Sequence, residues 1–191
     1  MKKPYVVGIA GGSASGKSTL CALLEKNLAD CRLAVFHMDK YFKPEEERPL
    51  AKAPVTGKIY SDHNCPETAD LPRLRRDLAA ACGDAETDVI IIEGLLTLWD
   101  DEIVSRLDLK LFVDCRPDER IVRRLRRNMG WGLAFDEIAG VYLDLVRYRH
   151  DEFVEPSKWR ADFILNGSLF SDKAAQILTD SIRAAVEAGG K

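Results

Sequence analysis

The residues best suited to chemistry form one glycine-rich segment near the start of the chain. In order they are Gly11, Gly12, Ser13, Ala14, Ser15, Gly16, Lys17, Ser18 and Thr19. This order fits the pattern G-x-x-x-x-G-K-[ST], whose glycines let successive backbone N–H groups turn toward one anion. Lys17 adds a mobile positive charge for the β- and γ-phosphates, and Ser18 adds a hydroxyl for Mg²⁺. The segment therefore predicts a loop that binds a nucleoside triphosphate.

Asp39 and Glu93 each follow an apolar run that predicts a strand. In a doubly wound sheet, ligands lie at the carboxyl ends of the strands. Asp39 could accept the proton of a substrate hydroxyl that attacks the γ-phosphate; the alternative is a helix cap or a solvated turn. Glu93 could hold Mg²⁺ or its water shell; the alternative is a salt bridge at the strand end. We predict that Asp39 is catalytic and that Ser18, Glu93 and Asp39 are candidate metal ligands.

A cluster of arginines lies within residues 120–127. The apolar residues Ile121, Val122 and Leu125 fit the inner face of a helix, which leaves the arginines pointing outward or toward the site. One interpretation is a solvated basic helix face. The other is a lid whose guanidinium groups neutralise charge on a transferred phosphoryl group. We predict a helical lid over residues 120–134.

Short buried strands alternate with helices, as a parallel sheet covered on both faces requires. The strands are expected at residues 5–10, 33–36, 89–92, 109–113 and 163–165. One helix is expected to begin at Leu20, one to run from Leu71 to Cys82, and one to begin at Ser171 or Asp172. This alternation predicts an α/β fold with a doubly wound five-stranded parallel sheet.

Residues 41–69 are rich in Pro, Glu, Lys and Asp, show no clear period, and are longer than an ordinary connection. Loops of this length usually carry function or are mobile, so we expect the phosphoryl acceptor to bind there. Directly after this segment, Asp70 is expected to cap the N-terminus of the next helix, and Gly83 to follow its end.

Composition indicates one globular domain over residues 1–191, with 46% hydrophobic and 31% charged positions. The formal net charge of −3 gives no field that would favour nucleic acid, so the expected partner is a small anion. The five cysteines form no C-x-x-C pair, which indicates reduced thiols and a cytoplasmic location. The apolar run at 5–10 is short and leads straight into the glycine-rich loop. We therefore expect a first strand rather than a signal peptide, and no membrane partner.

Further motifs follow the glycine-rich loop in order along nearly the whole chain. They are D-K-Y-F-K at 39–43, Y-S-D-H-N at 60–64, E-G-L-L at 93–96, the arginine cluster at 120–127, F-V-E-P-S-K at 153–158 and A-D at 161–162. Together they resemble the uridine kinase and phosphoribulokinase family of P-loop kinases, and most closely its uridine kinase branch. The phosphate loop is shared with many NTPases, whereas E-G-L-L and F-V-E-P-S-K-x-x-A-D are more specific.

This resemblance implies a P-loop NTPase/kinase fold with a helical lid, and ATP-dependent phosphorylation of a primary hydroxyl, often the 5′-hydroxyl of a nucleoside. It implies that Asp39 is the base, that Ser18 and Glu93 hold Mg²⁺, and that Arg124 and Arg127 occupy lid positions. With Lys17, the aspartate and these two arginines form the predicted catalytic set.

The resemblance also implies that Asp62 contacts the ribose hydroxyls. An alignment on Pro66 without a gap instead puts Asn64 in that position, so both residues stay candidates. Uridine kinases carry a hairpin between the D-H-P region and the E-G-I strand that grips the pyrimidine. Here one helix and a short polar connection lead to Val89, so we expect this hairpin to be absent.

The lid also departs from the family pattern. The family usually continues with a further R-G-R, where this chain has Trp131-Gly132-Leu133-Ala134. Part of the arginine clamp is therefore missing or is supplied from elsewhere, and Arg147 or Arg149 could supply it.

The sequence thus predicts a small-molecule kinase with ATP and Mg²⁺ as cosubstrates and a nucleoside as the leading acceptor. Alternatives are a kinase for nicotinamide riboside, pantothenate or a sugar phosphate, or a non-kinase regulatory protein that binds ATP. The chain has no N/T-K-x-D segment of a GTPase. The candidate acceptor-site residues are Asp39, Tyr41, Phe42, Asp62 and His63. Of these, Tyr41 and Phe42 could either stack on the acceptor or anchor the loop.

Overall fold

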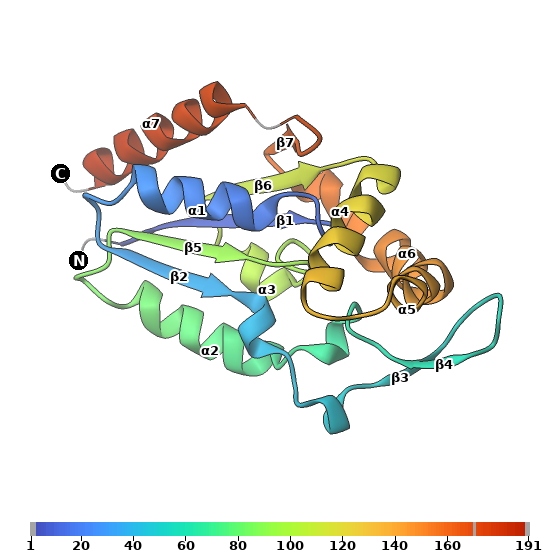
Figure 1. Ribbon diagram of the computed structural model, residues 1–191. Coiled ribbons are helices and arrows are strands. Elements are labelled where there is room, and N and C mark those ends of the chain that lie inside the picture. Colours follow the sequence, from blue (N-terminus) through green and yellow to red (C-terminus); the bar gives the residue numbers. More distant parts are fainter. Residues whose placement is uncertain (1–2, 170, 190–191) are drawn as a thin grey trace.

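The computed structural model of the chain describes residues 3–169 and 171–189, and a five-stranded parallel sheet forms its centre (Figure 1). The strands are β1 (Tyr5–Gly11), β2 (Leu33–His37), β5 (Val89–Glu93), β6 (Leu109–Asp114) and β7 (Phe163–Asn166). Their spatial order is β2-β5-β1-β6-β7. Helices cover both faces, so the predicted doubly wound α/β sheet is confirmed.

Alternate side chains of the central strands enter two separate hydrophobic cores. Val6 and Ile90 point to the face covered by α2 (Leu71–Cys82) and α3 (Asp101–Val104). The next residue along each strand points to the opposite face, which is covered by α1 (Lys17–Asn27) and α7 (Asp172–Gly189). Because both faces are buried, each central strand is a continuous apolar run, which is why the sequence predicted these strands.

The helix α1 begins earlier than we expected. The expected start was Leu20, whereas α1 begins at Lys17, directly after Gly16. Gly16 has φ 109°, a left-handed conformation that costs a glycine little and lets the loop turn sharply into the helix. Lys17 and Ser18 therefore lie in the first helical turn.

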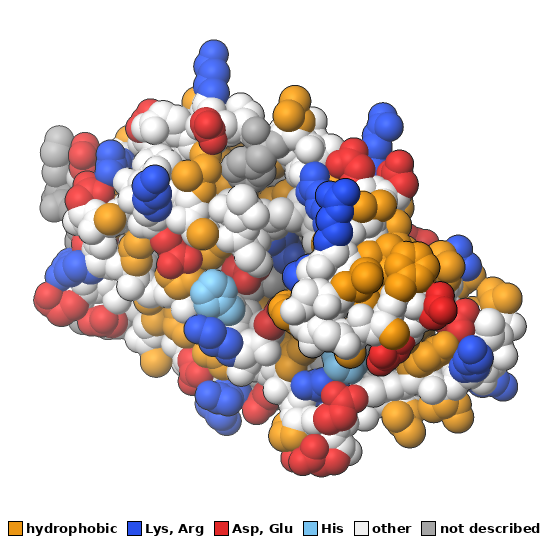
Figure 2. Space-filling view, viewed as in Figure 1, with side chains coloured by type: hydrophobic (Ala, Val, Ile, Leu, Met, Phe, Trp, Pro, Cys, Tyr) orange, Lys and Arg blue, Asp and Glu red, His pale blue; other side chains and the backbone are white. Residues whose placement is uncertain are grey.

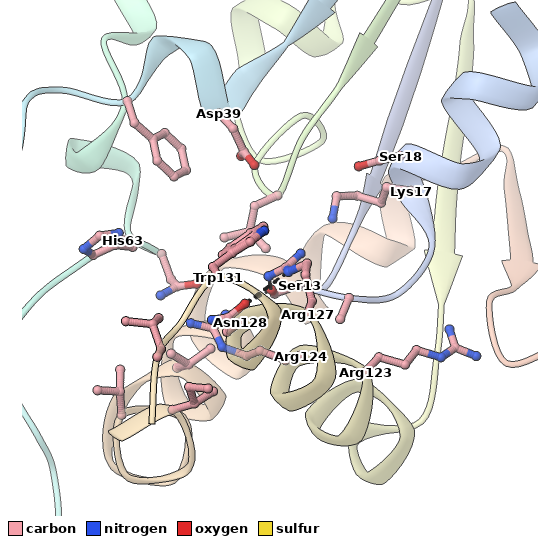
Figure 3. A pocket seen from close by; sticks show the side chains of 18 of the residues that line it. Ser13, Lys17, Ser18, Asp39, His63, Arg123, Arg124, Arg127, Asn128 and Trp131 are labelled. Carbon is pink, nitrogen blue, oxygen red and sulfur yellow. Dashed lines mark hydrogen bonds between the residues drawn. The ribbon is translucent and has the colours of Figure 1, made fainter. Parts of the chain in front are cut away.

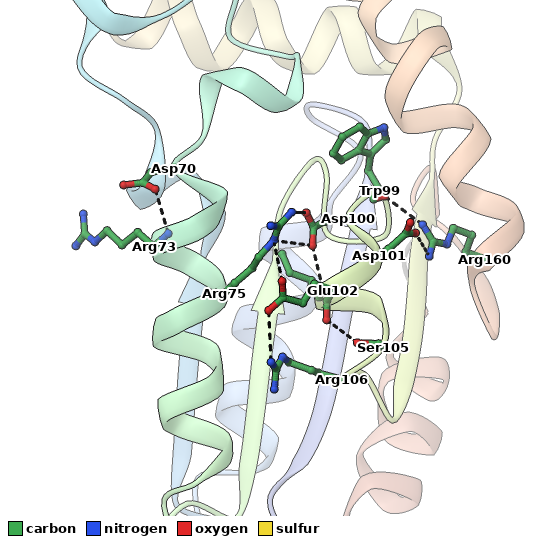
Figure 4. Close-up of polar contacts among 11 residues, drawn as sticks. Asp70, Arg73, Arg75, Trp99, Asp100, Asp101, Glu102, Ser105, Arg106 and Arg160 are labelled. Atoms are coloured by element: carbon green, nitrogen blue, oxygen red, sulfur yellow. Dashed lines mark hydrogen bonds and ion pairs between the residues drawn. The ribbon is translucent and has the colours of Figure 1, made fainter.

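Polar contacts cap helix α2 and join it to the segment that comes after β5 in the chain. The carboxylate of Asp70 accepts a hydrogen bond from Arg73 N, so the predicted cap is confirmed (Figure 4). From the middle of this helix, Arg75 pairs with Asp100, which is buried and also caps α3 through Ile103 N at 3.0 Å. At the other end Gly83 follows the helix without a positive φ, so its special freedom is not used there.

The segment 41–69 is more regular than we expected. It contains an antiparallel hairpin of β3 (Leu50–Lys52) and β4 (Ile59–Ser61) between short 3-10 helices. Strands of three residues are too short to give a visible period. Between residues 64 and 89, the chain forms a 3-10 turn, α2 and a short connection.

The predicted lid corresponds to α4 (Pro117–Gly130), followed by a turn and α5 (Phe135–Val141). A helical stretch of π, α and 3-10 turns, including α6 (Arg147–Arg149), continues to Arg160. The expected inner face of α4 is partly wrong, because Val122 is 45% exposed while Arg120 is only 5% exposed. Arg120 is buried because its guanidinium donates to Cys115 O and to His150 Nδ1.

No helix within the described ranges has both the length and the apolar character needed to cross a membrane.

Candidate active site

A cavity of about 960 Å³ lies at the carboxyl ends of the central strands, between the sheet and the α4–α5 lid (Figure 3). Figure 2, in the orientation of Figure 1, shows the surface hollowed beside the lid. Its walls come from the phosphate loop and α1, from the strand ends, from the segment around the β3–β4 hairpin, and from the lid. Residues from distant parts of the sequence therefore share one cavity.

The phosphate loop has the backbone that an anion cradle needs. Gly11 has φ 144°, and a Cβ at this position would lie 2.4 Å from Val113 O. Lys17 lines the cavity together with Ser13, Ser18 and Thr19 of the loop, and its Nζ donates to Gly12 O at 3.0 Å. Burial lowers the pKa of Lys17, and the nearby charges of Glu93 and Asp39 partly oppose this shift.

The two strand-end carboxylates both line the cavity. Asp39 lies in a 3-10 turn just after β2, and its side chain is exposed to the cavity. Glu93 ends β5, where the Oγ of Ser18 lies 3.4 Å from each of its carboxylate oxygens. The hydroxyl and carboxylate thus offer oxygen atoms at one point, which is the kind of donor that Mg²⁺ prefers.

His37 also belongs to this cluster, and the sequence analysis did not single it out. Its Nδ1 lies 3.0 Å from Glu93 Oε1, because His37 and Glu93 are register partners at the ends of β2 and β5. The available signal was that both predicted strands end in polar residues.

Two lid arginines meet the phosphate loop. Arg124 Nη1 donates to Ser13 Oγ at 3.0 Å, and Arg127 Nη2 lies 3.4 Å from the same oxygen. Burial, and then the positive charge of Arg127, lower the pKa of Arg124. Its Nε is buried without a hydrogen-bond partner, and within the described ranges neither arginine pairs with a carboxylate. Two unpaired guanidinium groups beside a phosphate loop form a site for an anion.

The other arginines have different partners. Arg123 lines the cavity but donates to Gly167 O and Ser168 O in the loop after β7. Neither Arg147 nor Arg149 lines the cavity, and Arg149 is paired with Asp62 and Glu152.

The half of the cavity farther from the phosphate loop has mixed walls. From the segment 42–64 it receives Phe42, Tyr60, Ser61, His63 and Asn64. From the lid it receives Leu133, Glu137, Ile138 and Val141, and from the helical stretch after α5 it receives Leu145 and Val146. Trp131 of the lid lies at the border with the phosphate-loop half. A mainly apolar wall with a few polar groups is typical of a small-molecule site.

Tyr41 and Phe42 separate into the two roles that the sequence left open. Phe42 lines the cavity. Tyr41 does not, because its hydroxyl donates to Asp77 at 2.9 Å and the guanidinium of Arg73 covers its ring. Burial and the bond to Asp77 raise the pKa of Tyr41 to about 12. In this structure Tyr41 anchors the loop to α2.

Asp62 and Asn64 are also separated. Asp62 is fully buried and does not line the cavity; its carboxylate accepts from Arg149 Nε at 2.6 Å and from Asn64 N at 2.9 Å. Asn64 and His63 do line it. Asp62 therefore holds the backbone of Asn64 in place, and the amide of Asn64 is the group of the two that faces the cavity.

Comparison with known proteins agrees with the motifs. The model of the phosphoribulokinase / uridine kinase family matches residues 78–169. A protein named uridine kinase from Geobacillus kaustophilus (strain HTA426) is 32% identical, and the match covers 97% of this chain and 97% of that protein. A second uridine kinase, from Lactococcus lactis subsp. lactis (strain IL1403), is 31% identical over 95% of this chain and 97% of its own.

Solved structures support the fold. A putative fructose transport system kinase from Silicibacter sp. TM1040 gives a TM-score of 0.66 at 18% identity, covering 86% of this chain and 90% of that one. A possible uridine kinase from Bacillus stearothermophilus gives 0.59 at 19% identity, covering 87% and 90%. The predicted kinase fold is thereby confirmed. With the sequence matches, these findings show that the chain belongs to the phosphoribulokinase / uridine kinase family.

Proposed function

We propose that this protein is a kinase that transfers the γ-phosphoryl group of ATP to a hydroxyl of a nucleoside, most simply its 5′-hydroxyl. One observation carries the proposal. The phosphate loop, a free strand-end carboxylate at Asp39, and two unpaired lid arginines all face one cavity with a mainly apolar second half. The relatives named uridine kinase support the nucleoside as acceptor.

The donor half would bind the triphosphate. Backbone N–H groups of residues 11–19 and the N-terminus of α1 would hold the phosphates. Lys17 would leave Gly12 O to reach the β- and γ-phosphates, and Arg124 and Arg127 would neutralise the charge that spreads over the transferred group. Lys17, Arg124 and Arg127 therefore act by charge and position, and no covalent bond to the protein is needed.

Ser18 and Glu93 fit the metal that such a reaction uses. Mg²⁺ is commonly bound through one or two carboxylates together with substrate phosphates. The Oγ of Ser18 and the carboxylate of Glu93 already lie together beside the loop, with Asp39 as a third candidate across the same cavity. When bound, the ion would offset phosphate charge.

Asp39 would be the general base. As the acceptor oxygen forms its bond to the γ-phosphorus, the hydroxyl proton would pass to the carboxylate of Asp39, and the bond to the β-phosphate oxygen would break to release ADP. Asp39 suits this role because its side chain opens to the cavity and is not held in an ion pair within the described ranges.

Residues 41–69 would bind the acceptor, and residues 120–134 would form the lid over it. His63, Asn64 and Phe42 would contact the nucleoside, with Asn64 rather than Asp62 facing the ribose. Within the described ranges Cys21, Cys65, Cys82 and Cys115 are free thiols, which together with the use of ATP supports a cytoplasmic location.

The test is ADP release measured with a panel of acceptors. The panel contains uridine, cytidine, adenosine, guanosine, nicotinamide riboside, pantothenate and ribulose 5-phosphate, with an acceptor-free reaction as control. We expect ADP release that depends on a nucleoside, with a matching nucleoside monophosphate as product. If only pantothenate or ribulose 5-phosphate is phosphorylated, the protein is a kinase but its acceptor is not a nucleoside. ADP release without any acceptor would contradict a kinase.

A further inference from the structure

Three aromatic side chains line the cavity, and their surroundings differ. Phe42 has the guanidinium of Arg48 at 6.0 Å from its ring centroid, and the hydroxyl of Tyr60 donates to Asp144 at 2.7 Å. Trp131 is 69% exposed, and no aromatic ring in the described part of the chain packs on it. It is the largest flat apolar surface that the cavity offers to a ligand.

Trp131 lies where the two halves of the cavity meet. The guanidinium of Arg127 covers one face of the indole, 5.0 Å from the ring centroid, and its Nη2 lies 3.4 Å from Ser13 Oγ in the phosphate loop. Figure 3 shows the indole beside Arg127, on the lid side of the space below Asp39. A group that binds against the indole would therefore be close to the transferred phosphoryl group.

The lid around Trp131 is unusually apolar for an exposed surface. Met129, Leu133 and Phe135 are exposed as well, and Figure 2 shows apolar side chains gathered over the α4–α5 region. Single exposed apolar residues are normal, whereas a gathered set beside a cavity commonly marks a binding surface. Of this set, Trp131 and Leu133 line the cavity itself.

We propose that Trp131 stacks on the base of the acceptor nucleoside, and that Arg127 holds the indole in position. This inference rests on the proposed function. The base is thus bound from the lid, by a residue that follows α4. Arg127 contacts both the indole and the phosphate loop, so the same side chain aligns the base with the phosphoryl group.

The proposal names the class of acceptor. Stacking uses the π-face that every base has, so it tolerates different bases. Selectivity among nucleosides should then stay within about 100-fold, well below the 10⁴-fold or more that buried polar readout gives. The expected substrates are ribosides with a flat base, pyrimidine and purine alike.

The first test compares Trp131→Ala, Trp131→Phe and the matched control Trp159→Ala. Trp159 is 80% exposed and does not line the cavity. Loss of one base–aromatic stack corresponds to about 5- to 150-fold in affinity. We expect Trp131→Ala to raise the KM for uridine about 10-fold or more, with the KM for ATP within about 2-fold, and Trp131→Phe to recover most of the loss. Trp159→Ala should behave as wild type.

The second test separates stacking from a structural role of the indole. The KM penalty of Trp131→Ala should vanish for methyl β-D-ribofuranoside, which has the ribose hydroxyls but no base. Uridine should quench the tryptophan fluorescence of wild type and of Trp159→Phe, and not that of Trp131→Phe. Trp131→Phe keeps an aromatic ring, so this signal remains available even if the alanine variant folds poorly.

The possible results are distinguishable. An unchanged uridine KM in Trp131→Ala, from an enzyme that phosphorylates uridine, overturns the inference and leaves the proposed function intact. A raised KM for ATP with an unchanged KM for uridine shows that the indole contacts the nucleotide, which also overturns it. If the wild-type protein phosphorylates no nucleoside, the proposed function and the inference fail together.

Discussion

At the scale of single residues, Asp39 and Asp62 show how two aspartates on nearby segments acquire different roles. Asp39 is exposed to the cavity and holds no ion pair within the described ranges, so its carboxylate is free to take a proton. Asp62 is fully buried and shares its two oxygens between Arg149 and Asn64 N. A buried carboxylate whose two oxygens both accept hydrogen bonds from the protein is suited to hold a structure rather than to accept a substrate proton.

Asp39→Asn tests the assignment of the base. The amide keeps the size of the side chain but cannot accept the proton, so kcat should fall about 100-fold while ATP affinity stays nearly unchanged. Single-turnover kinetics and nucleotide titration measure the two quantities. Asp118→Asn, an exposed position in the first turn of α4, serves as control and should keep full activity. Asp39 is not the base if its variant keeps more than about a third of wild-type activity.

Variants of Asn64 and Asp62 test which of these two residues contacts the acceptor. Asn64→Ala should raise the KM for the acceptor several-fold with little loss of stability, because its amide faces the cavity. Asp62→Asn should instead lower the free energy of unfolding by about 2 kcal/mol or more, because it removes the buried negative charge that faces Arg149 and leaves only one of the two accepting oxygens. Urea unfolding and steady-state kinetics of both variants separate the two roles. If Asp62→Asn raises the KM for the acceptor and Asn64→Ala lowers the stability, then Asp62 is the residue that contacts the ribose.

At the scale of elements, the β3–β4 hairpin is fastened to the helical stretch after α5. Asp144 accepts hydrogen bonds from Thr56 Oγ1 at 2.9 Å and from Tyr60 Oη at 2.7 Å. The hydrogen bond from Tyr60 and, to a smaller extent, the one from Thr56 hold the pKa of Asp144 below its usual range. Asp144 itself does not line the cavity, although Tyr60 and the neighbouring Leu145 do. The hairpin and the lid side are thus tied together around the acceptor half.

Asp144→Ala removes both hydrogen bonds of this tie at once, because a single oxygen, Asp144 Oδ2, accepts them both. Without these bonds the hairpin is held less firmly over the acceptor half, so the KM for the acceptor should rise several-fold while the KM for ATP stays the same. Asp144→Asn keeps an oxygen acceptor at the same place and should lose much less. Steady-state kinetics with both substrates varied gives the answer. Equal effects on ATP and acceptor would contradict a tie that is local to the acceptor half.

The helices and strands differ in how far the sequence could predict them. The strand β5 was predictable because four β-branched residues precede Glu93, and the start of α2 was predictable because Asp70 is a good cap. The β3–β4 hairpin was not, because its strands have three residues each. The burial of Arg120 was hidden because its partners come from other elements, and no spacing rule records them.

At the scale of the whole molecule, one buried junction joins the phosphate loop, the lid and the helical stretch behind them. A Cβ on Gly12 would lie 2.2 Å from Arg120 Nη1 and 3.0 Å from His150 Cε1, so this pair packs directly behind the loop. His150 Nδ1 accepts from Arg120 Nη1 at 3.2 Å, and its Nε2 lies 3.3 Å from Glu155. The charges facing the imidazole are therefore Arg120, Glu155 and Asp151.

This junction makes global stability depend on pH. Burial, and then the charge of Arg120, lower the pKa of His150 from 6.5 to about 4. Between these values the unfolded chain binds a proton that the folded protein does not, so unfolding becomes easier as pH falls from 6.5 toward 4. Over the whole window the loss approaches about 3 kcal/mol, and above pH 6.5 the contribution of His150 is fully retained.

His150→Asn should remove this part of the pH dependence, because the amide oxygen can still accept from Arg120 Nη1 but does not titrate. Urea unfolding at pH 7.5, 6 and 5 measures the free energy of unfolding of each protein. We expect the wild type to lose more stability than His150→Asn between the first and last of these values. His63→Asn is the matched control, because that imidazole is exposed and its loss should leave the wild-type slope unchanged. Parallel slopes for wild type and His150→Asn would mean that other groups dominate acid unfolding and that His150 already takes up its proton in the folded protein.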